Sequence, residues 1–299
     1  MSLHDELTVE PGPPGVRLVL EDEVSGVPAD ASNLAVRALS LLADAVGVEP
    51  AVTVRLRKGI PVAGGMAGGS ADAAAALVAG DALWNLATPA GRLHELAAML
   101  GSDVPFALCG GDALGTGRGE RLTKLSHPHR RYWVLAVAGE GLSTPAVYAE
   151  TDRQRAQAHQ PTKTEAHQPT KAEAHQPTQA ARPAKANRPE AADPAPVINA
   201  LADPDPTRLA GALRNDLQPA ALALRPSLAD VLVAGLDAGA LAGIVSGSGP
   251  TCAFLAADPL HAGQVANRLL AAALPAVHTV KVAHGSVAGA HLEALAVVS

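Results

Sequence analysis

Aromatic residues are nearly absent from this 299-residue sequence, at 2% of the chain with two each of Trp, Tyr and Phe. Hydrophobic residues still make up 48%, so a core has to be built from Ala, Val and Leu. Few rings are left for stacking on a ligand, and each ring near a candidate site therefore counts. The length lies between one large domain and two ordinary ones, which favours two domains.

Dense basic segments, long apolar runs and paired cysteines are also lacking. The formal net charge is −6 without a Lys/Arg block, so we expect no nucleic-acid partner. No apolar stretch is long enough to span a membrane and the first residues do not resemble a signal peptide, so we expect a cytoplasmic protein with no membrane partner. The only cysteines, Cys109 and Cys252, fit no metal-ligand spacing, which predicts buried reduced thiols and no metal site.

The apolar pattern predicts helices and strands in an irregular alternation. Residues 3–20 alternate around the turn-rich segment 11–15, which predicts a hairpin. A helix capped by Ser32 or Asn33 and ended by Gly47 follows. Further strands are expected over 51–56, 242–245, 251–255 and 279–282, and further helices over 71–83, 89–100, 217–224, 228–236 and 261–270. Without a regular βαβ rhythm, this order favours an α+β fold.

The composition changes between about residues 153 and 195. Near-copies of one octad begin at residues 158, 166 and 174, and they are too polar and too rich in proline to bury a core. We interpret 153–195 as a disordered low-complexity insertion. Its repeated histidines indicate a solvated linker more than a metal-binding tract; they are His159, His167 and His175.

The segment 58–70 holds too many glycines for a helix or a strand, and it leads directly into an Ala-rich helical run. Glycine lacks a Cβ and tolerates positive φ, so backbone amides in such a loop can approach a polyphosphate closely. The following helix points its free N–H groups and its positive dipole end to the same place. We therefore predict that ATP phosphates are bound by Pro61, Val62, Ala63, Gly64, Gly65, Met66, Ala67, Gly68, Gly69, Ser70 and Ala71.

Other interpretations of this loop fit less well. A flexible surface turn is disfavoured by the leading Pro61, the immediate helix and the lack of Ser/Asn padding. A Walker motif is excluded because no Gly-Lys-Ser/Thr ends the loop. A Rossmann fingerprint is a poor fit because no acidic residue follows at the end of a second parallel strand.

Phosphoryl transfer to a hydroxyl also needs a group that positions or deprotonates that hydroxyl. Asp103 is the candidate base, at an expected helix start with Pro105 in its first turn. The alternative role for an aspartate in this position is that of a helix N-cap.

Three segments together resemble the motifs of the GHMP kinases: the loop 61–71, the segment 101–106 around Asp103, and a second glycine turn over 246–251. Weaker similarities lie at 33–37, 117–120 and 215–217, and the match covers the chain apart from the octads. The resemblance implies an N-terminal ribosomal protein S5 domain 2-like domain over 1–128. It also implies a ferredoxin-like C-terminal domain over 129–152 and 196–299.

The triple-glycine form of the loop is most similar to the members of this family that act on 4-diphosphocytidyl-2-C-methyl-D-erythritol. This resemblance implies transfer of the γ-phosphate of ATP, with Mg²⁺, to the 2-hydroxyl of that small molecule by a monomer or homodimer, in the non-mevalonate route to isoprenoid precursors. Asp103 is then the base and Tyr148 stacks on the cytosine, with ordinary packing as its alternative. The implied adenine contacts are Asn33, Leu34 and Lys58, with a solvated loop cation as the alternative for Lys58. The implied substrate contacts of the second turn are Gly247, Ser248 and Gly249.

The family also begins with a Pro-Ala-Lys motif, whose lysine partners the catalytic aspartate, and a Gly-Tyr-His segment that contacts the cytidine. Neither lies ahead of the first expected strand here. We expect a start codon placed too late rather than a shortened protein, because loss of a strand exposes a sheet edge. A Pro-Ala-Lys motif shortly upstream of Met1 is the expected finding, and a stop codon there would contradict it. The competing functions are a nucleotide-binding protein with impaired catalysis, a kinase for another small alcohol, and a scaffold.

Overall fold

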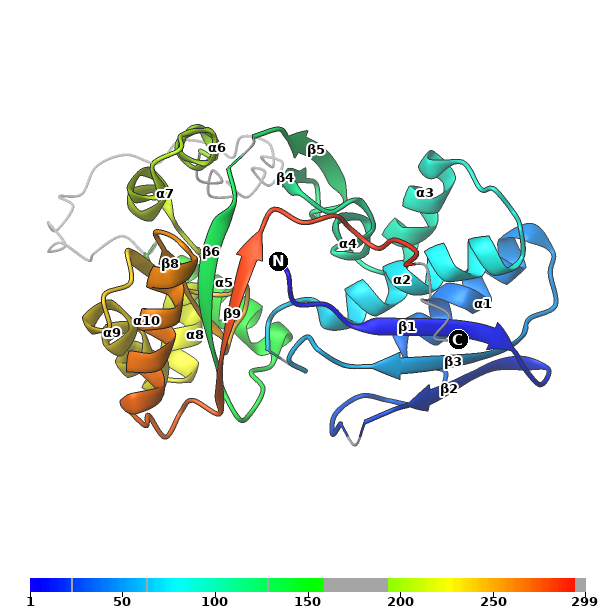
Figure 1. Cartoon of the computed structure of the whole chain (residues 1–299), viewed down its shortest axis with the longest axis horizontal. Helices are drawn as coiled ribbons and strands as arrows, with labels where there is room; N and C mark the ends of the chain where they lie inside the picture. The colour runs from blue at the N-terminus through cyan, green and yellow to red at the C-terminus, as the bar shows by residue number, and fades with distance from the viewer. Residues whose placement is uncertain (23, 63, 128, 159–192, 294–299) are drawn as a thin grey trace, which may run out of the picture.

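The computed structural model describes residues 1–299 apart from 23, 63, 128, 159–192 and 294–299, and the chain forms two lobes (Figure 1). The elements of the first lobe are β1 (Glu6–Pro11), β2 (Gly15–Leu20), α1 (Leu34–Val46), β3 (Ala51–Arg57), α2 (Gly68–Leu83), α3 (Ala90–Leu100), α4 (Val104–Cys109), β4 (Asp112–Thr116) and β5 (Arg121–Leu125). The elements of the second lobe are β6 (Arg131–Val137), α5 (Thr144–Ala158), α6 (Ala195–Ala202), α7 (Pro206–Ala212), α8 (Gln218–Leu224), α9 (Ser227–Asp237), β7 (Ala242–Val245), β8 (Cys252–Ala256), α10 (Pro259–Ala271) and β9 (Thr279–Gly285).

The sheet of the first lobe shows that the predicted hairpin is wrong. β1 and β2 do not pair with each other, because β3 lies between them, antiparallel to β1 and parallel to β2. The connection over residues 12–15 passes across the start of β3, where its glycine amides donate to Pro50 O at 2.7 Å and Ala51 O at 2.8 Å. Its two prolines favour an extended path that bridges two strand spacings, about 10 Å.

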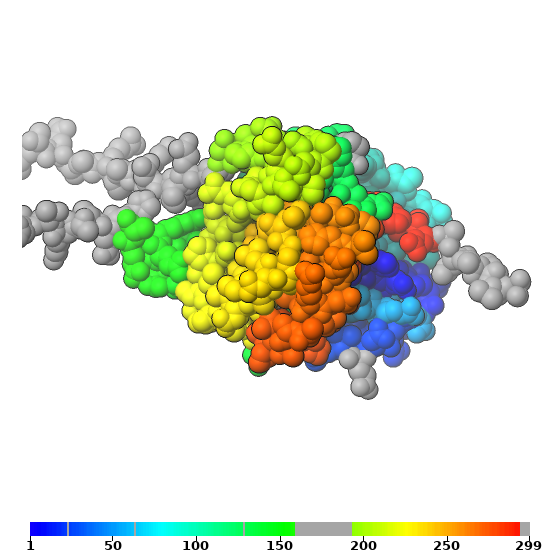
Figure 2. All heavy atoms as spheres, turned by 60° about the vertical axis from the view of Figure 1, so that its left-hand side comes forward, coloured from blue at the N-terminus to red at the C-terminus, as the bar shows by residue number. Residues whose placement is uncertain are grey.

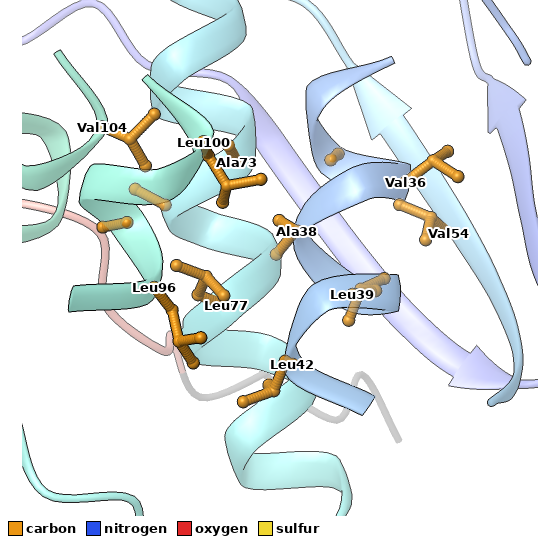
Figure 3. Packing of buried hydrophobic residues seen from close by; sticks show 14 of the residues in the cluster. Val36, Ala38, Leu39, Leu42, Val54, Ala73, Leu77, Leu96, Leu100 and Val104 are labelled. Atoms are coloured by element: carbon orange, nitrogen blue, oxygen red, sulfur yellow. The ribbon is translucent and has the colours of Figure 1, made fainter. Parts of the chain in front are cut away.

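The core of the first lobe consists of small and aliphatic side chains, as the scarcity of aromatics requires. α1 and α2 pack closely together (Figure 3). Leu39 and Leu42 of α1 and Leu77 of α2 are fully buried. Gly80 on α2 leaves room for this contact, since a Cβ there would lie 2.6 Å from Leu39 Cδ2. The packing fixes the start of α2 relative to α1, and the predicted phosphate loop ends at that start.

The second lobe contains a four-stranded antiparallel sheet in the order β7-β8-β6-β9. Figure 2 shows α6, α7, α9 and α10 on the outer face of this lobe. Phe254 on β8 is fully buried beside Gly235 and Gly243, where a Cβ would collide with its ring. Helices packed on a mixed three-stranded sheet and an antiparallel four-stranded sheet, together with the two-stranded antiparallel β4-β5 sheet, confirm the α+β class.

None of the individual helices in the described ranges has the length and apolarity to cross a membrane. Helices α8 and α9 are long and apolar enough only when they are counted together, and a sharp bend separates them.

Helix α5 extends into the range that was predicted to be a disordered insertion. The prediction assigned residues 153–195 to disorder, but α5 continues to Ala158. Glu150 stabilises this last part, since Arg153 Nε and Gln154 Nε2 donate to its carboxylate at 2.6 and 2.8 Å. The remainder of the octads, including the three repeated histidines, lies outside the described residues.

Two segments cross from one lobe to the other. Ser2 N–H donates to His284 O at 2.7 Å, and Ser2 Oγ accepts from His284 N–H at 3.0 Å, so this segment is attached to β9. In the opposite direction, residues 286–293 leave β9 and run toward the first lobe (Figure 1). Ala290 N–H donates there to Ala107 O of α4 at 2.9 Å. These last residues were predicted as part of the C-terminal domain, but by contact they belong to the first lobe.

Candidate active site

The glycine loop ends at the start of α2, which begins at Gly68 and therefore earlier than the predicted helix. Ala67 is the N-cap in a left-handed conformation with φ 54° and no side-chain cap. Its carbonyl accepts the amides of Ser70 and Ala71, both at 3.0 Å. The amides of Gly68 and Gly69 have no acceptor among the described residues. Two donors and the positive end of the helix dipole are thus available to an anion.

This loop packs against the second glycine turn, which lies on the other lobe. Gly65 has φ +70°, and a Cβ on it would lie 2.6 Å from the carbonyl oxygens of Ser246 and Gly249. Ser246 Oγ donates to Gly65 O at 3.2 Å, between residues 181 positions apart in the sequence. A Cβ on Gly64 would lie 3.0 Å from Thr251 Oγ1. The absence of side chains at Gly64 and Gly65 therefore lets the two predicted glycine segments meet.

The other residues of the loop surround this contact. Pro61 lies beside Gly64, with its Cβ 3.3 Å from the place that a Gly64 Cβ would take. Val62 faces the segment that precedes α1. Met66 packs against the sheet of the second lobe. Ala63 lies outside the described residues.

Side chains outside the motif hold the second glycine turn in place. Asn215 Nδ2 donates to Val245 O at 2.7 Å and to Gly247 O at 2.8 Å. Ser248 is buried, and its hydroxyl forms a 2.8 Å hydrogen bond with Thr144 Oγ1. Asn215 belongs to one of the weaker family similarities. Thr144 was missed, because no local pattern connects the start of α5 with a turn a hundred residues away.

Asp103 lies immediately before α4, which packs against α2 and α3. The residue takes the N-cap position of α4, as the alternative role predicted, but it is exposed and its side chain makes no capping hydrogen bond. Only its backbone carbonyl takes part in the helix start, where it accepts Ala107 N–H at 3.0 Å. Within the described ranges, the carboxylate has no hydrogen-bond or ion-pair partner. It is therefore available to a hydroxyl from outside the protein.

Asn33 caps α1, as the sequence predicted. Its Oδ1 accepts Ala35 N–H at 2.9 Å and its Nδ2 donates to Pro28 O at 2.8 Å. Leu34 Cδ1 lies 3.5 Å from the place that a Cβ on Gly69 would take. The start of α1 thus lies beside the start of α2, and Asn33 fixes the preceding segment next to the phosphate loop.

Lys58 lies in a buried ion cluster, so the solvated-cation alternative is wrong. Its Nζ is 2.5 Å from Asp5 Oδ2 and 2.7 Å from Asp72 Oδ2, and the three side chains are only 4–5% exposed. Two of its three donors are thus directed to carboxylates of the protein. Burial raises the pKa of Asp72 to about 7; the Lys58 ammonium opposes this shift and the neighbouring Asp5 carboxylate adds to it. Asp5 and Asp72 were missed because they meet only in the folded chain.

Tyr148 projects from α5 and is 55% exposed, whereas Val147 and Thr151 of the same helix are buried. Ordinary packing therefore does not account for this aromatic ring. α5 also carries Thr144 and is held by it to the second glycine turn. The ring is available for stacking on a ligand.

Two family models match the chain. The N-terminal domain of the GHMP kinases matches residues 33–111, a range that includes the glycine loop and Asp103. The C-terminal domain of the GHMP kinases matches residues 197–276, a range that includes the second glycine turn.

Similar proteins cover nearly the whole chain. A protein of Mycolicibacterium smegmatis named 4-diphosphocytidyl-2-C-methyl-D-erythritol kinase is 48% identical over 98% of this chain and 82% of its own length. A protein of that name from Salinispora tropica is 50% identical over 98% of this chain and 84% of its own length. A crystal structure of 4-(cytidine 5'-diphospho)-2C-methyl-D-erythritol kinase aligns with a TM-score of 0.65 and 30% identity, over 95% of this chain and 86% of the other. A homoserine kinase from Cytophaga hutchinsonii, with a TM-score of 0.64 at 19% identity over 96% of this chain and 86% of the other, shares the fold.

Proposed function

Because the chain belongs to the GHMP kinase family, we propose that it transfers the γ-phosphate of ATP to the 2-hydroxyl of 4-diphosphocytidyl-2-C-methyl-D-erythritol, in the non-mevalonate route to isoprenoid precursors. The observation that carries phosphoryl transfer is the start of α2, where two amides that have no acceptor among the described residues lie beside the contact between the two glycine segments. The acceptor is supported by relatives of that name, which are 46–50% identical over 97–98% of the chain.

ATP would be held by its phosphates at the start of α2. The Gly68 and Gly69 amides would donate to phosphate oxygens, and the helix dipole favours their negative charge. Asn33 and Leu34 would line the adenine side, since the start of α1 lies beside this position. Binding at fixed backbone donors requires no rearrangement when charge builds up during transfer.

Asp103 would act as the general base. Its carboxylate would accept the proton of the acceptor 2-hydroxyl while that oxygen forms a bond to the γ-phosphorus. The bond between the γ-phosphorus and the bridging oxygen breaks, ADP leaves, and the proton stays on Asp103. The lack of any partner for this carboxylate among the described residues supports the assignment.

The cytidine part of the acceptor would meet Tyr148 and the second glycine turn. The exposed ring of Tyr148 would stack on the cytosine, and Gly247, Ser248 and Gly249 would contact the acceptor. The hydrogen bond between Thr144 and Ser248 ties α5 to this turn, so both parts of the pocket would keep their spacing.

Mg²⁺ would accompany ATP as the ion bound to its phosphates. In the part of the chain that the structure describes, no group of three or more His, Cys, Asp or Glu side chains is arranged to hold a metal ion. This fits an ion held mainly by phosphate and water oxygens, as Mg²⁺ commonly is. When bound, it would neutralise charge on the phosphates.

The test is an ADP-release assay with 4-diphosphocytidyl-2-C-methyl-D-erythritol, homoserine, mevalonate and galactose as acceptors. We expect turnover of the first compound alone. Asp103→Asn should lower kcat by about 10²–10⁴-fold with little change in thermal unfolding, because the carboxylate is exposed and makes no capping hydrogen bond. Asp44→Asn, which changes an exposed carboxylate on α1, is the matched control and should retain activity.

Three results would contradict the proposal in different ways. Turnover of another acceptor would leave a kinase with the wrong substrate assigned. ATP binding without turnover of any acceptor would indicate a nucleotide-binding protein with impaired catalysis. Full activity of Asp103→Asn would remove the assigned base.

A further inference from the structure

The cluster of Asp5, Lys58 and Asp72 lies directly behind the predicted phosphate site. Asp5 precedes β1, Lys58 follows β3, and Asp72 lies in the second turn of α2. A Cβ on Gly68 would be 3.4 Å from Lys58 Nζ, so the ammonium is next to the first turn of the helix. Any charge on this cluster therefore acts on an anion bound at the helix start.

Both carboxylate oxygens of Asp5 act as hydrogen-bond acceptors. Its Oδ1 accepts the amides of Gly59 and Ile60 at 2.7 and 2.8 Å, and its Oδ2 binds Lys58 at 2.5 Å. These amides belong to the two residues that lead into the glycine loop. Asp5 thus fixes the point at which the loop leaves β3.

Asp72 is the member of the cluster whose carboxylate can carry a proton. Its Oδ2 binds Lys58, but its Oδ1 is buried and has no partner among the described residues. With both carboxylates ionised, the cluster would carry one uncompensated negative charge at 4–5% exposure, which is costly. A proton on Asp72 Oδ1 makes the cluster neutral.

We propose that Asp5, Lys58 and Asp72 act together as positioning residues for ATP: the trio fixes the start of the glycine loop against α2 and, by holding one proton, presents no net charge to the phosphates. This inference rests on the proposed function. Loss of the proton leaves a negative charge behind the helix start, where it opposes the phosphates. ATP binding should therefore favour the protonated cluster.

No charged group other than Lys58 and Asp5 acts on the Asp72 carboxylate among the described residues. The helices packed against α2 contribute apolar core residues, among them Leu39 of α1, Leu100 of α3 and Val104 of α4. Lys281 Nζ is directed to the carbonyl of Gly59, at 3.2 Å.

The experiment measures the Kd of Mg·ATP without an acceptor between pH 6 and 8.5, for the wild type, Asp72→Asn and the control Asp44→Asn. Because the pKa of Asp72 is raised to about 7, we expect the wild-type Kd to rise about threefold to tenfold over this range. Asp72→Asn keeps the cluster neutral, so its Kd should stay at the low-pH value, while Asp44→Asn should follow the wild type. The kcat at saturating ATP should have the same pH profile in all three proteins.

Thermal unfolding provides the structural readout. Since the pKa of Asp72 is higher in the folded chain than its ordinary value of 3.8, its contribution to stability is complete below about pH 4 and is lost as the pH rises through about 7. The Tm of the wild type should fall relative to that of Asp72→Asn over this interval.

Calorimetry of the wild type keeps the test valid if Asp72→Asn does not fold. Titration of Mg·ATP at pH 7.5 in buffers of different ionisation enthalpy should show proton uptake, and its absence would overturn the proposal. An Asp72→Asn variant with the wild-type pH slope, or weakened equally at every pH, would also overturn it. ATP binding with a flat wild-type pH profile contradicts the proposal for the Asp5–Lys58–Asp72 cluster alone, whereas no ATP binding at any pH contradicts the proposed function as well.

Discussion

Gly69→Ala separates a role in folding from a role in phosphate binding. Gly69 is the second residue of α2, and a Cβ on it would make an ordinary 3.5 Å contact with Leu34 Cδ1. Alanine in a helix is more favourable than glycine by up to about 1 kcal/mol. The substitution should therefore leave the free energy of unfolding unchanged or raise it. If phosphate oxygens approach this amide, however, the new methyl group blocks them.

The size of the binding effect follows from the bond that is lost. A hydrogen bond to a charged group contributes about 1.5–3 kcal/mol, and about 1.4 kcal/mol corresponds to a factor of ten in Kd. We expect the Kd of Mg·ATP to rise about tenfold to hundredfold in Gly69→Ala, by titration calorimetry, with a Tm equal to or above that of the wild type.

Gly91→Ala is the matched control for this experiment. Gly91 is the second residue of α3, is exposed, and has nothing within 4 Å of its Cβ position. It should show the same small gain in stability with unchanged ATP binding. If Gly69→Ala also binds ATP like the wild type, the phosphates do not lie at the start of α2.

Substitutions at two more positions address the contact between the lobes and the acceptor pocket. Gly65→Ala should lower the free energy of unfolding by about 2–4 kcal/mol in urea titrations, since it combines a positive φ with overpacking against Ser246 O and Gly249 O; a loss below about 1 kcal/mol would contradict this reasoning. Tyr148→Ala should raise the KM of the acceptor about tenfold with an unchanged Tm, and Tyr148→Phe should restore the KM, because stacking needs the ring alone. An effect of Tyr148→Phe as large as that of Tyr148→Ala would indicate a role for the hydroxyl instead.

Local patterns were sufficient for most of the helices and strands. Asn33 caps the start of α1, and Gly47 ends the helix in a left-handed conformation with φ 72°. Both ends could be predicted because a helix cap depends only on neighbouring residues. The pairing of strands was harder to predict from the sequence. The alternation in residues 3–20 indicated two strands, but it did not indicate that β3 lies between them. Which strand pairs with which depends on the whole chain, and no short segment contains that information.

The site shows the same division. The glycine loop and Asp103 carry recognisable local motifs, so both could be proposed from the sequence. Asp5, Asp72 and Thr144 had no such motif, since each acquires its partner from a distant part of the chain. Lys58 was noticed for its place in the loop, but its burial between two carboxylates follows from the packing of β1, β3 and α2.

The exchange of segments between the lobes has a consequence for dissecting the enzyme. A cut near residue 128 would leave one fragment with residues that attach to β9 and another with residues that attach to α4. Each fragment would expose a surface that the other normally covers, so neither is a self-sufficient half. When they are co-expressed, the two fragments should reassociate and be recovered together, because each crossing segment binds to the other fragment.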